Sequence, residues 1–409
     1  MPPISPARPP GRLTMTGDLF NDVQRAIDRE WMFGILGEMI LIRSENPFED
    51  PPMEGYREKE MADYLAGQLS ALGLKVETRE VRPGRPNVFG FLNGKKGQAA
   101  LMLASHMDTA RTTGYPGAYD VRFEGGRLHG RGACDMKASL AAYLGVVKAL
   151  RESGVRLNGN LIVCGIVDEE YHMLGSKAIG QGGRMADQGI IGEPTNLKIC
   201  PSNKGRVSTK FITRGRAAHS SVPEKGVNAI AKMAKVIQAF DDYNRELLGR
   251  TPHPLCGHGR FTPGMIRGGV QVNMVPDYCE LEVDRRTLPG ESLESVYAEF
   301  HERVRKAAEG DPDFVCEITD PTWLIAANDI SPDEPVVAAL REAHRGLFGK
   351  DPGVEAFAAG SDAPYMGFPT VLCGPGSINQ AHTTCEFVDL QEVVDAARLY
   401  LYAALRLLE

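Results

Sequence analysis

The sequence lacks the paired cysteine spacing of a cysteine-bound metal site and the cysteine pattern of a disulfide-rich protein. Its eight cysteines are scattered singly over 409 residues, and no CxxC pair occurs. The first residues, MPPISPARPPGRLTMTGDLF, also lack the apolar core of a secretory signal. A long chain without such a signal is typical of a reducing compartment. We therefore expect reduced, buried thiols rather than disulfides, and a cytoplasmic location.

Long hydrophobic runs and clusters of basic residues are absent as well. The longest strongly apolar stretch, residues 140–150, is interrupted by Lys148, whereas a membrane span needs ~20 apolar residues. Lysine and arginine number 46 against 53 for aspartate and glutamate, which gives a net charge of −7. These features exclude a membrane span and argue against a nucleic-acid partner. The GxGxxG and P-loop patterns are missing too, so nothing supports nucleotide binding.

The sequence does contain an α/β pattern that is interrupted once. Residues 1–17 are rich in proline, and we expect them to be a disordered leader, with Met15 as an alternative start. Apolar runs such as LMLA and LIVCGIV predict strands covered on both faces of a mixed, largely parallel sheet. Residues 205–318 instead follow a β-α-β-β-α-like order, which predicts an inserted α+β domain of ferredoxin-like type. Residues 18–204 and 319–409 then form one α/β domain.

Acidic and histidine residues follow several predicted strands at the point where each strand ends. They are His106 and Asp108 after LMLAS, Asp135 before a predicted helix, Asp168 to Glu170 after LIVCGIV, Glu193 after GIIG, and His382 after TVLCG. In open α/β sheets, ligands bind beyond the carboxyl ends of the strands. These segments can therefore meet at one rim of the sheet.

Each of these residues alone has an ordinary structural explanation. A single histidine after a strand is usually a satisfied structural residue, and three consecutive acids usually form a solvated loop. Asp135 in front of a helix is a good N-cap. Together the set indicates a metal site, because imidazole and carboxylate groups are suitable ligands for Zn²⁺. A shared carboxylate can hold two such ions ~3.5–4 Å apart.

A series of segments resembles, in order and spacing, the dinuclear zinc hydrolases that include acetylornithine deacetylase, succinyl-diaminopimelate desuccinylase, aminoacylase and carboxypeptidase G. The segments are SHMDT, GRGACDMKA, VDEE, GEPT, AAHSSVPEKGVNAI, VNMVPDYCELEVDRRTLPGE, AAGSDAP and GPGSINQAHTTCEF. The resemblance covers the chain from about residue 30 onward. It implies that the α/β domain is a catalytic metal-binding domain and that residues 205–318 are an inserted lid and dimerisation domain.

For the metal site, the resemblance implies two divalent ions, with zinc favoured and cobalt or manganese as alternatives. His106 and Glu193 would bind one ion, and Glu170 and His382 would bind the other. Asp135 would bridge both ions.

Two further carboxylates are implied to act beside the ligands. Asp108 would fix the ring of His106. Glu169, next to the ligand Glu170, would be the general base that takes a proton from a metal-bridging water and passes it to the leaving amine.

The remaining implied residues would contact the substrate. His219 would stabilise the oxyanion from the lid of the partner subunit in a homodimer, although on its own it reads as an ordinary polar residue ahead of a helix. Asn273 and Arg286 would contact the substrate's carboxylate or carbonyl group. Ser361 and Gly376 would shape the pocket wall, with a tight turn as the alternative explanation for the glycine.

The leading functional hypothesis is metal-dependent hydrolysis of the amide bond of a small N-acyl-amino acid. GEPT and GPGSINQAH are most similar to the deacetylase and desuccinylase branch. The alternatives are a dipeptidase, a carboxypeptidase-G-type enzyme or a specialised catabolic amidohydrolase of the same family. A non-catalytic module that binds metal or an amino acid would need the loss of Glu169 or a ligand, and all of them are present. The sequence leaves the acyl group, the amine and the metal open.

Overall fold

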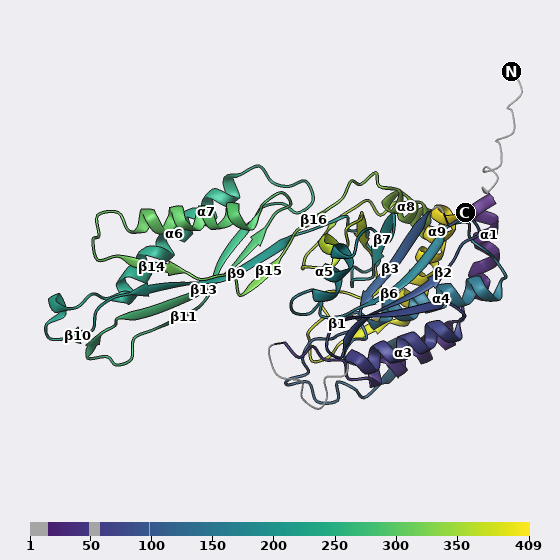
Figure 1. Cartoon of the computed structure of the whole chain (residues 1–409), viewed down its shortest axis with the longest axis horizontal. Coiled ribbons are helices and arrows are strands. Elements are labelled where there is room, and N and C mark those ends of the chain that lie inside the picture. The colour runs from purple at the N-terminus through teal and green to yellow at the C-terminus, as the bar shows by residue number, and fades with distance from the viewer. Residues whose placement is uncertain (1–14, 49–57, 98) are drawn as a thin grey trace, which may run out of the picture.

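The computed structural model describes residues 15–48, 58–97 and 99–409, which form two domains joined end to end (Figure 1). One domain is built on a six-stranded sheet and the other on a five-stranded sheet. In spatial order, the first sheet consists of β1 (Lys75–Arg82), β2 (Arg85–Leu92), β6 (Asn160–Ile166), β3 (Ala100–His106), β7 (Gln188–Ile191) and β18 (Thr370–Leu372). The second consists of β11 (Arg260–Gly268), β13 (Tyr278–Thr287), β9 (Gly205–Arg214) and β14 (Val315–Ile318), with β15 (Trp323–Ile325) also paired to β9.

Short strands and helices complete the described chain. The short strands are β4 (Arg122–Glu124), β5 (Arg127–His129), β8 (Ser202–Asn203), β10 (Ala218–His219), β12 (Met274–Val275), β16 (Asn328–Asp329), β17 (Ala356–Phe357) and β19 (Phe387–Asp389). The α-helices are α1 (Met15–Val23), α2 (Arg29–Leu41), α3 (Glu58–Ala71), α4 (Lys137–Glu152), α5 (Leu174–Gln181), α6 (Ala229–Gly249), α7 (Leu293–Ala307), α8 (Pro335–Phe348) and α9 (Leu390–Leu408). Short 3-10 turns lie at Gln24–Ala26, Pro223–Lys225 and Ala363–Tyr365.

The larger sheet is mixed and mostly parallel, as the sequence predicts. Strands β6, β3, β7 and β18 are mutually parallel neighbours, and β2 and β1 extend the sheet in antiparallel pairing. The parallel strands are almost fully buried, because helices cover both of their faces. Helices α2, α3, α4, α8 and α9 pack on one face, and α5 packs on the other. All four parallel strands therefore end at one rim of the sheet.

The inserted domain, called the lid below, is an antiparallel sheet covered by α6 and α7 on one face. The alternation in β9 and β13 explains this, because every second residue is buried against the helices. The order β9, α6, β11, β13, α7, β14 matches the predicted ferredoxin-like arrangement. The predicted boundary at residue 318 is too early, because β15 still pairs with β9. The chain returns to the larger domain only after that strand.

The structure also bears on the predictions for the N-terminal leader, the cysteines and a membrane span. The predicted leader lies mostly on residues outside the described ranges, but α1 already begins at Met15, inside residues 1–17. Residues 269–276 contain only the short strand β12, and Val272 is fully exposed. The eight cysteines are free thiols, and six are buried. None of the helices in the described ranges combines the length and apolar character needed to cross a membrane.

Candidate metal centre

The predicted metal ligands gather at the rim where the parallel strands end. His106 is the last residue of β3, Glu170 follows β6, and Glu193 follows β7. His382 lies in the loop after β18, and Asp135 lies just before α4. Because these strands are parallel neighbours, their carboxyl ends carry the side chains to one place.

Asp135 lies between the two histidines. Its Oδ1 atom is 3.0 Å from Nε2 of His106, and its Oδ2 atom is 3.6 Å from Nε2 of His382. Nε2 of His382 is also 2.9 Å from Oε2 of Glu170. His106, Asp135 and Glu170 offer ligand atoms that all lie within 4.8 Å of one another. One oxygen of Asp135 thus faces each histidine, as expected for a carboxylate shared by two ions.

Two buried carboxylate oxygens of the cluster lack partners. Oε1 of Glu170 and Oε1 of Glu193 are buried and have no hydrogen-bond partner among the described residues. Burial raises the pKa of Glu193 well above its ordinary value, and the nearby Asp135 raises it further. Burial also raises the pKa of Glu170, although its hydrogen bond to His382 opposes that shift. Unpartnered buried oxygens beside imidazole nitrogens fit divalent cations, so the residues present suit the ions that the sequence implies.

Glu169 lies beside this cluster and lines the cavity in front of it. Its Oε2 atom is 3.9 Å from Nε2 of His106, and its side chain is only 11% exposed. Burial raises the pKa of Glu169 well above its ordinary value, and Glu193 adds to the effect while His106 opposes it. Glu169 therefore lines the cavity together with the carboxylates of Asp135, Glu170 and Glu193, and unlike those three it is not one of the predicted metal ligands.

Asp108 contacts the site differently from what the sequence predicts. The ring of His106 is held by the backbone carbonyl of Asp108, which lies 2.8 Å from Nδ1, whereas the carboxylate Oδ1 is 3.7 Å away. The carboxylate instead accepts the backbone N–H groups of Glu169 and Glu170, at 3.2 and 3.1 Å. The two-residue spacing places the carbonyl near the ring and leaves the carboxylate to hold the loop after β6. Asp108 thus positions both glutamates through their backbone.

A buried network continues from Asp108 to the same loop. Nδ2 of Asn46 donates to Oδ2 of Asp108 at 2.8 Å and to Oδ1 of Asp168 at 3.0 Å. Nη2 of Arg85 donates to Oδ1 of Asp168 at 2.6 Å, and Arg85 also pairs with Glu58. The backbone N–H of Asp168 donates to Oε1 of Glu58. Sequence analysis missed Asn46, Arg85 and Glu58, because no spacing links them to the acidic triplet.

Glu386 and Arg131 were also missed, and they hold the loop that carries Asp135. Oε1 of Glu386 accepts the backbone N–H groups of Cys134 and Asp135, at 2.9 and 3.0 Å. Its Oε2 accepts Nη1 of Arg131 at 2.7 Å. Glu386 is fully buried and Arg131 is 3% exposed. The available signal was that both residues stand inside the motifs that carry ligands, GRGACDMKA and HTTCEF.

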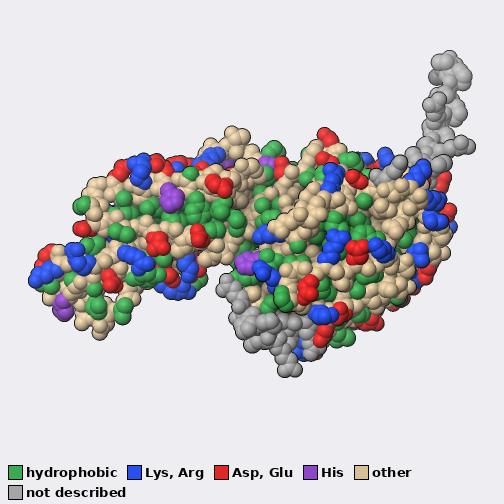
Figure 2. All heavy atoms as spheres, in the orientation of Figure 1, with side chains coloured by type: hydrophobic (Ala, Val, Ile, Leu, Met, Phe, Trp, Pro, Cys, Tyr) green, Lys and Arg blue, Asp and Glu red, His purple; other side chains and the backbone are tan. Residues whose placement is uncertain are grey.

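A cavity of about 290 Å³ opens in front of the ligands, and the lid contributes charge to it. Arg206 on β9 and Arg286 on β13 are cross-strand neighbours that both line this cavity. They pair with the same carboxylate, Asp284, at 2.6 and 2.7 Å. Two guanidinium groups thus share one carboxylate, which leaves an excess of positive charge on the lid side of the cavity. Figure 2 shows the surface hollowed between the two domains, below their junction.

Ser361 and Gly376 do not belong to the lining of this cavity. Ser361 is fully buried and its hydroxyl donates to Oδ1 of Asn203 at 3.0 Å. Gly376 has a φ of +85°, and a Cβ atom there would lie 2.8 Å from Sγ of Cys134. Both positions therefore support the packing behind the cavity, and Ile378 and its apolar neighbours form the wall instead.

His219 and Asn273 lie far from the ligands of their own chain. His219 is on β10, which Figure 1 places at the tip of the lid, away from the larger domain. Nδ1 of His219 accepts the hydroxyl of Ser221 at 2.7 Å. The backbone carbonyl of Asn273 accepts the N–H of Ser220, so both residues belong to one exposed structure. The structure thus brings the two together but does not bring them to the metal ligands.

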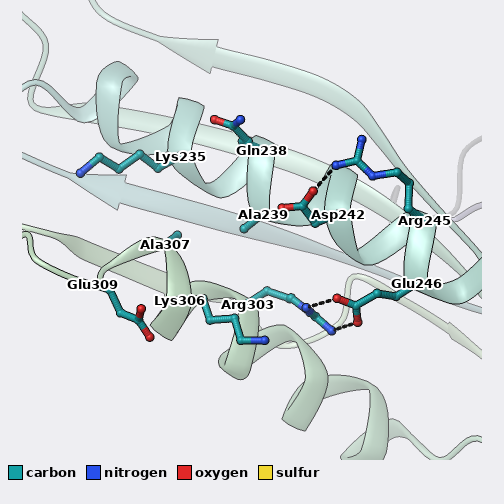
Figure 3. A pocket seen from close by; sticks show the side chains of 10 residues that line it. All are labelled: Lys235, Gln238, Ala239, Asp242, Arg245, Glu246, Arg303, Lys306, Ala307 and Glu309. Atoms are coloured by element: carbon teal, nitrogen blue, oxygen red, sulfur yellow. Dashed lines mark hydrogen bonds and ion pairs between the residues drawn. The ribbon is translucent and has the colours of Figure 1, made fainter.

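A larger hollow, of about 740 Å³, lies between α6 and α7 on the lid (Figure 3). Two ion pairs join its lining residues: Asp242 with Arg245, and Glu246 with Arg303. The predicted metal ligands are not among its lining residues. Most of the predicted ligands line the smaller cavity at the sheet rim, and none of them lines this hollow.

Solved structures share this two-domain fold. Aminopeptidase PepT from Bacillus cereus superposes with a TM-score of 0.76 at 23% identity, covering 94% of this chain and 100% of that one. An M20 family metallo-carboxypeptidase from Sulfolobus solfataricus gives a TM-score of 0.74 at 19% identity, covering 92% and 98%. At these identities the likeness shows the fold.

Sequence comparisons give the family. Acetylornithine deacetylase from Edwardsiella ictaluri is 32% identical over 348 residues, which cover 82% of this chain and 87% of the relative. N-formyl-4-amino-5-aminomethyl-2-methylpyrimidine deformylase from Bacillus subtilis is 27% identical over 387 residues, covering 87% and 90%. Residues 102–406 match the family described as peptidase family M20/M25/M40. The chain therefore belongs to peptidase family M20/M25/M40 and is a metal-dependent hydrolase of amide bonds.

Proposed function

We propose that this protein hydrolyses the amide bond of a small N-acyl-amino acid with two divalent ions, most simply zinc. The observation that carries the proposal is the arrangement around Asp135, with one of its oxygens toward each histidine. A separate carboxylate, Glu169, faces the cavity beside them. The proposed ligands are His106, Asp135, Glu170, Glu193 and His382.

The proposed division of labour follows from these positions. When bound, divalent ions would polarise an amide carbonyl and lower the pKa of a water molecule in the site. Glu169 takes a proton from the attacking water and delivers it to the leaving nitrogen. Asp108 holds the backbone of Glu169, so the base keeps its place while it gains and loses the proton. A ligand such as Glu170 could not do this work, because coordination would make it a weak base.

The lid arginines support a substrate that carries a carboxylate. Arg286 and Arg206 share only Asp284, so an incoming carboxylate would find a guanidinium partner in the cavity. The deacetylase and deformylase relatives support removal of an acyl group from nitrogen. Together these features favour N-acyl-amino acids, in the manner of acetylornithine deacetylase or succinyl-diaminopimelate desuccinylase, over neutral amides.

We also propose that the active form is a homodimer in which the partner subunit's His219 reaches the site. Within a single chain, His219 lies at the lid tip, away from the proposed metal ligands of that chain. Apolar side chains are exposed near it on the lid: Val270 is 88% exposed and Val272 is fully exposed. Such a surface favours contact with a second copy.

A substrate panel with zinc- and cobalt-loaded protein tests the function. N-acetyl, N-succinyl and N-formyl amino acids should be hydrolysed, whereas their methyl esters should react far more slowly. Arg286→Met should remove most of this acid-over-ester preference. Arg267→Met, an exposed lid arginine paired with Glu280 and Glu282, is the matched control and should preserve it. Faster turnover of dipeptides would instead support a dipeptidase, and active dialysed enzyme without transition metal would refute the site.

A further inference from the structure

A second cavity, of about 600 Å³, adjoins the first and has an aromatic lining. It is lined by Phe48, Ala110, Arg111, Glu170, Tyr171, Trp323 and His382. Glu170, Trp323 and His382 line both cavities. An amide bond held beside the proposed ligands Glu170 and His382 therefore has one cavity available for the group on each of its two sides.

Three half-buried aromatic rings form one continuous row in this cavity. The ring centroids of Phe48 and Tyr171 are 5.2 Å apart, and those of Tyr171 and Trp323 are 5.6 Å apart in an edge-on contact. The row crosses the domain junction, because Trp323 belongs to lid strand β15 whereas Tyr171 follows the ligand Glu170. The cavity wall is thus a set of ring faces and edges, which attract another ring more strongly than an aliphatic group of equal size.

A guanidinium group lies against the ring at each end of this row. The guanidinium of Arg206 lies 4.3 Å from the ring centroid of Trp323, and that of Arg111 lies 4.6 Å from that of Phe48. These contacts fix the two terminal rings.

The two cavities differ in what they can bind. The smaller contains Arg206 and Arg286, which suit the carboxylate of the amino-acid part. The larger offers the aromatic row beside Glu170 and His382, and its one guanidinium, Arg111, lies against the ring of Phe48. We propose that the larger cavity receives a planar aromatic acyl group, so that the preferred substrates are N-aroyl-amino acids. This rests on the proposed function, and it makes Phe48, Tyr171 and Trp323 the residues that determine acyl specificity.

Matched substrates and variants test the specificity. N-benzoyl-L-alanine is compared with N-cyclohexanecarbonyl-L-alanine, which has similar size but no planar ring, and with N-acetyl-L-alanine. We expect the benzoyl compound to have the highest kcat/KM. Phe48→Leu should lower that value about 2- to 12-fold, as for loss of one aromatic contact, and leave the acetyl compound within about twofold. Phe48→Tyr keeps an aromatic ring and should retain the original kcat/KM for the benzoyl compound. Phe123→Leu, which replaces an exposed ring on β4, should change the kcat/KM of neither compound.

A binding measurement separates this proposal from the proposed function. The sequence has two tryptophans, so Trp31→Phe leaves Trp323 as the single fluorescent indole. Benzoate should quench its emission at lower concentration than cyclohexanecarboxylate, in the metal-loaded protein and without turnover. If benzoate is preferred but no amide is cleaved, the aromatic cavity stands and the hydrolase assignment fails. If amides are cleaved but neither kcat/KM nor binding prefers the planar ring, the aromatic proposal is refuted.

Discussion

Replacing Glu386 by glutamine tests whether a buried ion pair holds the loop of Asp135. The substitution keeps the shape of the side chain, so it opens no cavity. A glutamine carbonyl can still accept the backbone N–H groups of Cys134 and Asp135, which Oε1 accepts in the structure. Its amide nitrogen then faces Nη1 of Arg131, where Oε2 accepts a hydrogen bond of 2.7 Å. Two hydrogen-bond donors, the glutamine amide and Nη1 of Arg131, then face each other. The positive charge of Arg131 also loses its acidic partner.

The magnitude follows from the burial of both partners. Glu386 is fully buried and Arg131 is 3% exposed, so water cannot replace the lost acceptor. Removing one member of a buried pair costs about 3–5 kcal/mol, because the remaining charge is left uncompensated. A surface pair should behave differently. Lys198 and Glu355 are each 50% exposed, so Glu355→Gln should cost less than about 1 kcal/mol.

Urea unfolding of chelator-treated protein is the assay, because bound metal would otherwise add its own stabilisation. Fluorescence and circular dichroism should be read together, since two domains can unfold separately. The double variant of Arg131→Met and Glu386→Gln should be more stable than Glu386→Gln alone, because it contains no unpaired charge. A loss below about 1 kcal/mol for Glu386→Gln, or no recovery in the double variant, would refute the reasoning.

Three other outcomes are expected. Glu169→Gln should lower kcat about 10²–10⁴-fold with metal content unchanged, whereas Glu170→Gln should lower both; normal turnover by the first variant would remove Glu169 from the mechanism. His219→Ala should lower kcat about 10²–10³-fold, and mixing it with Glu169→Gln should restore activity if subunits exchange and the site is shared. If subunits exchange and no activity returns, His219 either acts within its own chain or has no role in the reaction. Ion pairs with lysines lower the pKa of Asp311 to about 2, so its stabilisation is present above about pH 4 and is lost as pH falls toward 2. Asp311→Asn should therefore flatten the dependence of unfolding free energy on pH in that window, and an unchanged slope would contradict this.

Local pattern in the sequence was sufficient to predict the rim of the larger sheet. Apolar runs identify β3 and β6 as buried strands, and His106 and Glu170 stand at or just beyond their ends. Parallel pairing then brings such residues together without any knowledge of side-chain packing. The lid order could be predicted for the same reason, because alternation and helical spacing are short-range signals.

The sequence by itself therefore determined the two domains, the rim and the residue types gathered there, since each depends on neighbours along the chain. Tertiary structure decided what depends on distant segments. It alone brought Glu386 under the loop of Asp135, gave the Asp108 carboxylate two backbone N–H groups, and joined Phe48 to Trp323 through Tyr171. These contacts link residues far apart in the chain, so no spacing in the sequence marks them. They form only when the sheet, its loops and the returning lid strand are packed together.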